Sequence, residues 1–294
     1  MDQEQAKAFF VVRVLMAVIA FTLGLGLARE DFARVARERK AVLVGMTAQT
    51  ILVPLLGFAV AFGFRLEPKL AIGLVLLCAC PGGIHSNYYN KLARGDVALS
   101  MTLTSVSTLV NLGTLPLWVL AGTKVFSGHG EVVTMSSGDA IFELVALIGF
   151  PLLVGMAIRA RKAELAARVE RGMMITSGLL LVLVILGSVL KQAGLMVQHA
   201  VLVGLPVLVL QAIAMGSSYA FARVTGLPMP QRITVALEGG IQNATLAFAL
   251  AIALTRDLTV AVPAIVYSVA IYFTAAVFIP IGRATIAPPE PVVD

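Results

Sequence analysis

Nine long apolar runs follow one another along the chain, and short polar stretches separate them. Each run is about as long as the roughly 20 apolar residues that a helix needs to cross a bilayer. The pattern predicts an all-α polytopic membrane protein with about nine transmembrane helices, and it leaves little chain for a soluble domain. The runs cover residues 8–28, 41–64, 70–92, 97–121, 140–158, 173–190, 197–222, 230–254 and 258–282.

The composition supports a membrane protein. Hydrophobic residues make up 59% of the 294 residues and charged residues 13%, whereas soluble domains are about 45–50% apolar and about 25% charged. The charged side chains are too few to cover a water-facing fold of this size, which excludes a soluble enzyme, a disordered chain and a coiled coil. The two cysteines, Cys78 and Cys80, lie within one apolar run and lack the spacing of a zinc site.

Basic residues concentrate in alternate loops, which predicts the orientation of the spans. The net charge of +6 is typical of basic cytoplasmic loops and indicates no nucleic-acid partner. We expect the N-terminus outside and the C-terminus in the cytoplasm, with the chain in the inner (plasma) membrane. The acidic residues Asp2 and Glu4 before the first run favour a retained span over a cleaved signal peptide. The tail 285–294 is expected to be disordered and cytoplasmic.

Two parts of the chain, 68–121 and 228–282, show the same features in the same order. Each contains a Gly-Gly pair followed by polar residues, then an arginine and an aspartate, and finally a long apolar helix. In the predicted topology the two parts enter the membrane from opposite sides, which is the inverted repeat of many secondary transporters. The alternative is that glycine pairs recur by chance in apolar sequence.

Each repeat contains one span that the sequence interrupts. Pro81 with Gly82 and Gly83 should break span three, and Gly239 with Gly240 should break span eight. Broken backbone at membrane depth is tolerated only where it lines a cavity or is buried in protein. The alternative is a kink or a close contact between helices.

Glu238 is the only acidic residue well inside a predicted span, and no lysine or arginine occupies the middle of any span. An ionised carboxylate at that depth costs at least about 2.5–3.5 kcal/mol, so we expect an imported metal ion or a proton to neutralise it. The alternative is a structural glutamate bonded to a neighbouring helix. Oxygen-bearing side chains gather near both breaks and suit a hard monovalent cation such as Na⁺. They belong to Gln49, Ser86, Asn87, Ser100, Thr104, Gln242 and Asn243.

Two motifs, at residues 80–100 and 238–243, and a further feature, Gln49 with Pro54, point to one family. In these features the chain resembles the bile acid:sodium symporter family, and the resemblance covers nearly the whole chain. The resemblance implies a Na⁺-coupled symporter of organic anions in which spans three and eight cross. It also implies a panel domain, residues 1–40 and 138–195 with spans one, five and six. The core domain would be residues 41–121 and 196–284, with spans two to four and seven to nine. Bacterial members often have ten helices, and this chain has about nine, as animal members do.

The resemblance also assigns ligands, and it implies two sodium ions. One sodium site would use Ser86, Asn87, Ser100, Thr104 and Glu238. The second would use Gln49, Glu238 and Gln242 with the backbone carbonyls of Gly239 and Ile241.

Asn87 and Asn243 would lie nearest the substrate, and His85 and Tyr88 are further substrate-binding candidates. His85, Tyr88 and Gly239 depart from the family pattern, so the substrate pocket need not suit a bile acid. His85 can be a hydrogen-bonded pocket residue or a proton relay, and Tyr88 can pack or contact substrate.

The function that these observations favour is sodium-coupled symport of an organic anion by alternating access, by a monomer in the lipid bilayer. The alternatives are a proton-coupled carrier or an exporter of related fold, and a membrane receptor that binds ligand without moving it. The sequence does not identify the anion.

Overall fold

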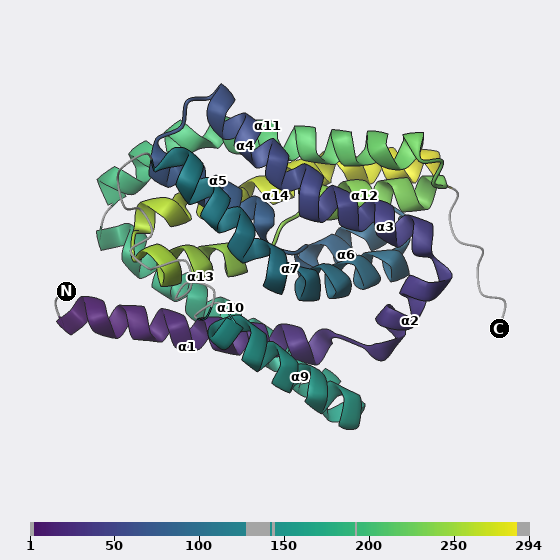
Figure 1. The fold of residues 1–294 in the computed structure, drawn as a ribbon, viewed down its shortest axis with the longest axis horizontal. Helices are drawn as coiled ribbons and strands as arrows, with labels where there is room; N and C mark the ends of the chain where they lie inside the picture. Colours follow the sequence, from purple (N-terminus) through teal and green to yellow (C-terminus); the bar gives the residue numbers. More distant parts are fainter. Residues whose placement is uncertain (1–2, 128–141, 143–144, 192, 287–294) are drawn as a thin grey trace.

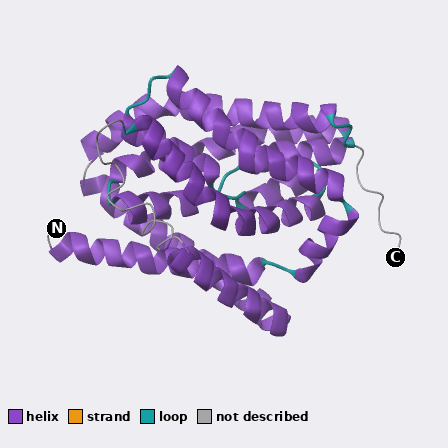
Figure 2. Cartoon of the chain, in the orientation of Figure 1, coloured by secondary structure: helices purple, strands orange, loops and turns teal. Residues whose placement is uncertain are grey.

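The structure is a computed structural model that describes residues 3–127, 142, 145–191 and 193–286 (Figures 1 and 2). These residues are almost entirely helical, and they form no β-strand beyond one isolated bridge. The first half contains α1 (Gln3–Gly26), α2 (Arg29–Arg37), α3 (Arg39–Thr47), a π-helical segment η1 (Ala48–Leu52), α4 (Val53–Gly63), α5 (Pro68–Ala79), α6 (Ile84–Leu92) and α7 (Val97–Phe126). The second half contains a π-helical segment η2 (Val145–Gly149), α9 (Phe150–Arg161), α10 (Ala163–Lys191), α11 (Ala193–Val224), α12 (Met229–Gly240), α13 (Ala244–Thr255) and α14 (Leu258–Thr285).

Four of the described helices are long and apolar enough to cross a membrane: Arg39–Gly63, Val97–Phe126, Met196–Val224 and Leu258–Thr285. A fifth is added if Phe10–Gly26 and Arg29–Arg37, which bend by 59° where they join, count as one span. These five coincide with five of the nine apolar runs, so the predicted helical membrane protein is confirmed. The full count of nine spans stays a prediction.

The remaining four runs are also helical where the structure describes them. Runs 70–92 and 230–254 are each divided into two short helices, as the glycine pairs predict. Runs 140–158 and 173–190 correspond to η2 with α9 and to α10, although residues 140, 141, 143 and 144 lie outside the described residues. The expected disorder of the tail falls on residues 287–294, which also lie outside them.

The helices α1, α9 and α10 pack on one another and form a separate layer along one side of the molecule (Figure 1). α1 and α9 approach closely because Gly24 and Gly155 carry no side chains: a Cβ on Gly24 would collide with the carbonyl of Leu152. The same layer meets the rest of the protein through α13 and, via η2, through α7. This grouping has the membership that a panel of spans one, five and six requires, but the division into panel and core stays a prediction.

Alternate loops gather at opposite ends of the molecule. At one end, the guanidinium of Arg94 donates to the carbonyl oxygens of Arg283 (3.1 Å) and Ile286 (2.8 Å). At the other end, Lys69 Nζ lies 2.6 Å from a carboxylate oxygen of Asp257. Spans that alternate in direction must bring every second loop to the same end, and these contacts have that pattern. The side of the membrane on which each end lies stays a prediction.

The order α5, break, α6, α7 returns as α12, break, α13, α14. In Figure 1, α5 lies to the left of α6, whereas α12 lies to the right of α13, so the chain runs through the two breaks in opposite directions. The first halves of both broken helices lie in the interior of the protein, since Leu70 to Ala79 of α5 and Ile233 to Gly240 of α12 are all buried. Protein, rather than solvent or lipid, therefore covers the two interruptions.

Candidate cation site at the crossed helix breaks

The two helix breaks cross each other and are joined by backbone hydrogen bonds. Gly82 and Gln242 form an antiparallel β-bridge. The Gly83 N–H donates to the Ile241 carbonyl (3.0 Å), and the Asn243 N–H donates to the Pro81 carbonyl (2.9 Å). Extended backbone leaves its polar groups without helical partners, and here each break supplies the partners that the other lacks.

The breaks lie near the middle of the helices that they interrupt. α5, α12 and α13 each have 12 residues, which at 1.5 Å per residue is about 18 Å and well short of the roughly 30 Å hydrocarbon core. The free carbonyls at the ends of α5 and α12 and the free N–H groups at the starts of α6 and α13 therefore meet at the crossing. Several of them already have partners: the Leu246 N–H at the start of α13 donates to Asn243 Oδ1 (3.0 Å), and the Gly240 carbonyl at the end of α12 accepts from Tyr267 Oη (2.7 Å).

Glu238, in the last turn of α12, is surrounded by hydroxyl groups and is only 2% exposed. Its Oε1 lies 2.5 Å from both Ser86 Oγ and Ser100 Oγ, and its Oε2 lies 3.1 Å from Thr104 Oγ1. Ser86 comes from the first turn of α6, and Ser100 and Thr104 lie one turn apart on α7. Two neighbouring helices, α6 and α7, thus direct three hydroxyls at a carboxylate from α12, which is far away in the sequence.

This cluster has more oxygen acceptors than hydrogens to satisfy them. Ser86 Oγ also lies 2.8 Å from the Gly83 carbonyl, and Ser100 Oγ lies 2.7 Å from Asn87 Oδ1. Each serine hydroxyl carries a single hydrogen yet lies near two acceptor oxygens. It can donate to only one of them, so the other oxygen faces the hydroxyl without a hydrogen between them. A cation, or an added proton, relieves this excess. The structure brings together all five residues of the first predicted sodium site.

A second polar group lies on the other side of the crossing. Gln49 Nε2 donates to Gln242 Oε1 (2.6 Å) and to the Cys80 carbonyl (3.1 Å), and Gln242 Nε2 donates to the Gly239 carbonyl (2.9 Å). Gln49 Oε1 is buried and has no hydrogen-bond partner within the part of the chain that the structure describes.

The second predicted sodium set is only partly assembled. Gln49, Gln242 and the Gly239 carbonyl lie together, but the Ile241 carbonyl accepts the Gly83 N–H. The hydrogen bonds of Glu238 run to Ser86, Ser100 and Thr104 of the first set.

The backbone around Gln49 is π-helical, and this conformation often marks functional positions. Pro54 has no N–H, so the Thr50 carbonyl loses its helical donor. Trp118 of α7 supplies one instead, because its Nε1–H donates to that carbonyl (3.0 Å). The proline therefore loosens the helix beside Gln49, and the tryptophan holds the loosened turn in place.

The four substrate-binding candidates do not all lie at the Glu238 cluster. Asn87 belongs to the Glu238 cluster through Ser100, whereas Asn243 caps α13 at the crossing. His85 is exposed, and its ring meets that of Tyr272 on α14 edge-on, with centroids 6.5 Å apart and an angle of 73° between the ring planes. Tyr88 is 62% exposed. Within the described residues, no hydrogen bond joins His85 or Tyr88 to the Glu238 cluster.

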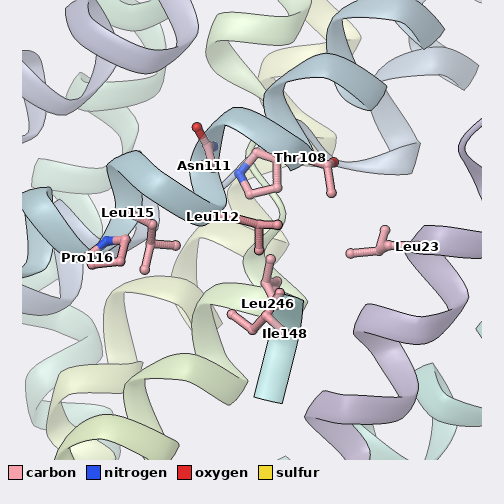
Figure 3. Close-up of a pocket in the computed structure, with 9 residues that line it drawn as sticks. Leu23, Thr108, Asn111, Leu112, Leu115, Pro116, Ile148 and Leu246 are labelled. Atoms are coloured by element: carbon pink, nitrogen blue, oxygen red, sulfur yellow. The ribbon is translucent and has the colours of Figure 1, made fainter. Parts of the chain in front are cut away.

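A small cavity lies beside the first break, between α1 and η2 on one side and α7 and α13 on the other (Figure 3). Pro81, Thr108, Asn111 and Leu246 contribute to its lining together with Leu23 of α1. Its volume of about 20 Å³ is enough for about one water molecule. It is too small for an organic anion in this arrangement of the helices.

Comparison with known proteins identifies the family. The model of the sodium bile acid symporter family matches residues 13–200. The chain belongs to this family. The protein named as the uncharacterized sodium-dependent transporter YocS of Bacillus subtilis (strain 168) is 28% identical over 258 residues, 88% of this chain and 78% of that protein. The ileal sodium/bile acid cotransporters of Homo sapiens and Oryctolagus cuniculus are 28% and 29% identical, over 80% of this chain and 67% of each of theirs.

The family match confirms the resemblance that the sequence motifs indicate. It also confirms the class of protein, which is a transporter. The family members named above are transporters, so a sodium-dependent membrane transporter is supported and an enzyme is not. The ligand assignments for the two sodium sites and for the substrate stay predictions, since the comparisons name no residues.

Two buried polar residues in this symporter family member were missed by the sequence reasoning. Asn90 is fully buried, and its Nδ2 donates to the Ser86 carbonyl and to Ser100 Oγ, each at 3.0 Å. Asp31, in the polar stretch after the first apolar run, is 7% exposed and accepts from Ser105 Oγ at 2.7 Å. The unusually polar stretch after Asn87 was a signal for Asn90, whereas nothing in the local sequence marks Asp31 as buried.

Replacing Asn90 by alanine is expected to raise the Na⁺ concentration for half-maximal stabilisation about tenfold. The change removes the buried side-chain donor to Ser100 Oγ. Loss of such a donor costs about 1–3 kcal/mol, and 1.4 kcal/mol is a factor of ten in affinity. Thermal unfolding of the purified protein in NaCl and in KCl measures this shift. Thr102→Val is the control, because among the residues that the structure describes the Thr102 hydroxyl bonds only to the Ala98 carbonyl of its own helix (2.9 Å). An unchanged Na⁺ midpoint in Asn90→Ala would contradict a role for Asn90 in positioning Ser100.

Proposed function

We propose that this protein is a sodium-coupled symporter of an organic anion that works by alternating access. The observation that carries the proposal is the convergence of three hydroxyls on the buried carboxylate of Glu238 at the crossing of two broken helices. Sodium is cargo in this scheme. Its first site consists of Ser86, Asn87, Ser100, Thr104 and Glu238.

Binding of Na⁺ neutralises Glu238 and links α6, α7 and α12 through a single ion. Because α12 belongs to one repeat and α6 and α7 to the other, occupancy of this site stabilises the crossing itself. A ligand shifts a conformational equilibrium only by its differential affinity for the two states. Na⁺ has that differential affinity if the oxygen cluster comes apart when the crossing changes.

The anion binds beside the same cluster. Asn87 contacts Ser100 through its Oδ1, so its amide N–H group is left to face the substrate when that oxygen is held by the cation site. The starts of α6 and α13 provide the positive ends of two helix dipoles, which favour an anion. These features provide anion recognition without lysine or arginine, and they couple the substrate to Na⁺ through Asn87.

A second Na⁺ binds near Gln49 and Gln242. Gln49 Oε1, which is buried and has no hydrogen-bond partner within the described residues, supports this site because it is free to coordinate the ion. Two Na⁺ with one monoanion carry one positive charge inward, and the membrane potential contributes about 2.3 kcal/mol per 100 mV to that movement.

The moving parts are a panel of α1, α9 and α10 and a core formed by the other spans. In the membrane the chain has nine spans, an inverted repeat, an external N-terminus and a cytoplasmic C-terminus, and it acts as a monomer in the inner (plasma) membrane. The small volume beside Pro81 then belongs to a closed arrangement, in which α1 and η2 cover the substrate route.

The test is a screen followed by transport. Thermal stabilisation against a library of bile acids, small carboxylates and sulfonates, in NaCl and in KCl, identifies a ligand whose effect requires Na⁺. Uptake of that ligand into proteoliposomes is then expected to follow an inward Na⁺ gradient and to increase with an inside-negative potential. Uptake that follows a pH gradient and ignores Na⁺ would select the proton-coupled carrier, and binding without accumulation would select the receptor.

A further inference from the structure

A basic hollow lies where the elbow between α2 and α3 meets the turn between α11 and α12. It is open on one side, has a volume of about 360 Å³, and is lined by residues 36–41, 226–228 and Gln231. Three of these residues, Arg37, Arg39 and Lys40, are basic and exposed. The hollow is at the opposite end of the bundle from the Lys69–Asp257 pair and shares no residue with the Glu238 cluster.

The positive charge of this hollow is not neutralised within the described residues. The only carboxylate in its lining, Glu38, lies 3.3 Å from the guanidinium of Arg34 and accepts from Gln231 Nε2 at 3.2 Å. Arg37, Arg39 and Lys40 form no ion pair with a residue that the structure describes. Three like charges therefore line one concave surface, an arrangement that favours a bound anion.

Two membrane-capable helices end at this hollow. The helix Arg39–Gly63 begins in its lining, and the helix Met196–Val224 ends two residues before Gly226. The ends of membrane-spanning helices lie at the depth of the lipid headgroups. Apolar side chains continue from the hollow along these helices, since Leu43 is 67% exposed and Val224 is 86% exposed. A ligand that fits both features carries an anionic group on an apolar body that extends along the helices.

We propose that the hollow binds the headgroup of an anionic phospholipid, with the phosphate against Arg37, Arg39 and Lys40 and the acyl chains beside Leu43 and Val224. Basic pockets between helices at the membrane surface are known to bind such headgroups. The bound lipid would hold the α2–α3 elbow against the α11–α12 turn. Because this elbow connects the α1 layer to the rest of the protein, the lipid would stabilise the fold at the joint between its two layers.

The experiment uses the purified full chain in an uncharged detergent and measures its unfolding temperature. Short-chain phosphatidylglycerol is expected to raise this temperature saturably, by several degrees more than short-chain phosphatidylcholine, and added salt should reduce the difference. The triple variant Arg37→Gln, Arg39→Gln, Lys40→Gln is expected to lose at least half of the effect. The matched control Arg161→Gln, Lys162→Gln, Arg168→Gln, in the exposed α9–α10 region, should keep it.

Several results would overturn the proposal. Equal stabilisation by phosphatidylcholine, or an equal loss in both triple variants, would mean that the hollow does not recognise the anionic headgroup. Equal stabilisation by glycerol phosphate would assign the site to a free phosphate compound rather than to a lipid. If the first triple variant does not fold, a photoactivatable phosphatidylglycerol is cross-linked to the unmodified protein. Labelling is expected in peptides that contain residues 36–43 or 224–231, and labelling only elsewhere would contradict the assignment.

Discussion

Replacing Glu238 by alanine is expected to abolish Na⁺-dependent uptake while leaving the protein folded. The substitution removes the only carboxylate from the cluster and with it the contacts to Ser86, Ser100 and Thr104. Hydrogen bonds to a charged group are worth about 1.5–3 kcal/mol each, so the Na⁺ affinity should fall by about 100-fold or more. Folding should survive because Ser86 and Ser100 keep other acceptors, the Gly83 carbonyl and Asn87 Oδ1.

Uptake into proteoliposomes and Na⁺-dependent thermal stabilisation measure the two parts of this result. Glu164→Ala, at an exposed carboxylate in the first turn of α10, is the matched control and should behave as the unmodified protein does. Glu238→Gln keeps the shape but not the charge, so it should fold well and also lose the response to Na⁺. Sodium-dependent transport at the unmodified level in either Glu238 variant would refute both the cation site and the proposed coupling.

The sequence predicted the features that depend on local composition. Apolar runs predict where the helices lie, because a segment in lipid must satisfy its backbone hydrogen bonds internally and therefore forms a helix. Pro81 and the two glycine pairs place the breaks because they remove donors or favour non-helical backbone. The boundaries agree closely for the helices Arg39–Gly63, Val97–Phe126 and Leu258–Thr285.

The sequence could not predict what depends on long-range packing. The pairing of Gly82 with Gln242 joins residues 160 positions apart, and only the assembled fold brings them together. Asp31 shows the same limit: it follows a loop and lies among arginines, yet it becomes buried because α2 turns back against α7 and meets Ser105. Glu238 and the four side chains around it stood out by their polarity near the breaks, and the family resemblance assigned them to one site, whereas Asn90 was found only from its contacts.

Adding a single methyl group at Gly82 is expected to weaken Na⁺ binding as strongly as a change in a ligand. A Cβ at this position would lie 2.5 Å from Glu238 Oε2 and 3.6 Å from Thr104 Oγ1. The Glu238 side chain is buried and held by hydroxyls on both oxygens, so it cannot move aside without giving up some of those contacts. Overpacking of this kind costs about 1–3 kcal/mol, which predicts a loss of apparent Na⁺ affinity of about fivefold to 100-fold in Gly82→Ala.

A control variant and a shorter side chain at position 238 distinguish this steric effect on Na⁺ binding from a general loss of stability. Gly113→Ala, on α7, is the matched control, because a Cβ there meets no atom within 4 Å, and its Na⁺ midpoint should not change. The double variant Gly82→Ala, Glu238→Asp shortens the carboxylate side chain by one methylene and makes room for the added methyl group. It should therefore bind Na⁺ better than Gly82→Ala alone, although Glu238→Asp by itself should bind Na⁺ more weakly than the unmodified protein. If the two substitutions simply add, the close approach of Gly82 to Glu238 does not control the cation site, and Gly82 matters only for the backbone crossing.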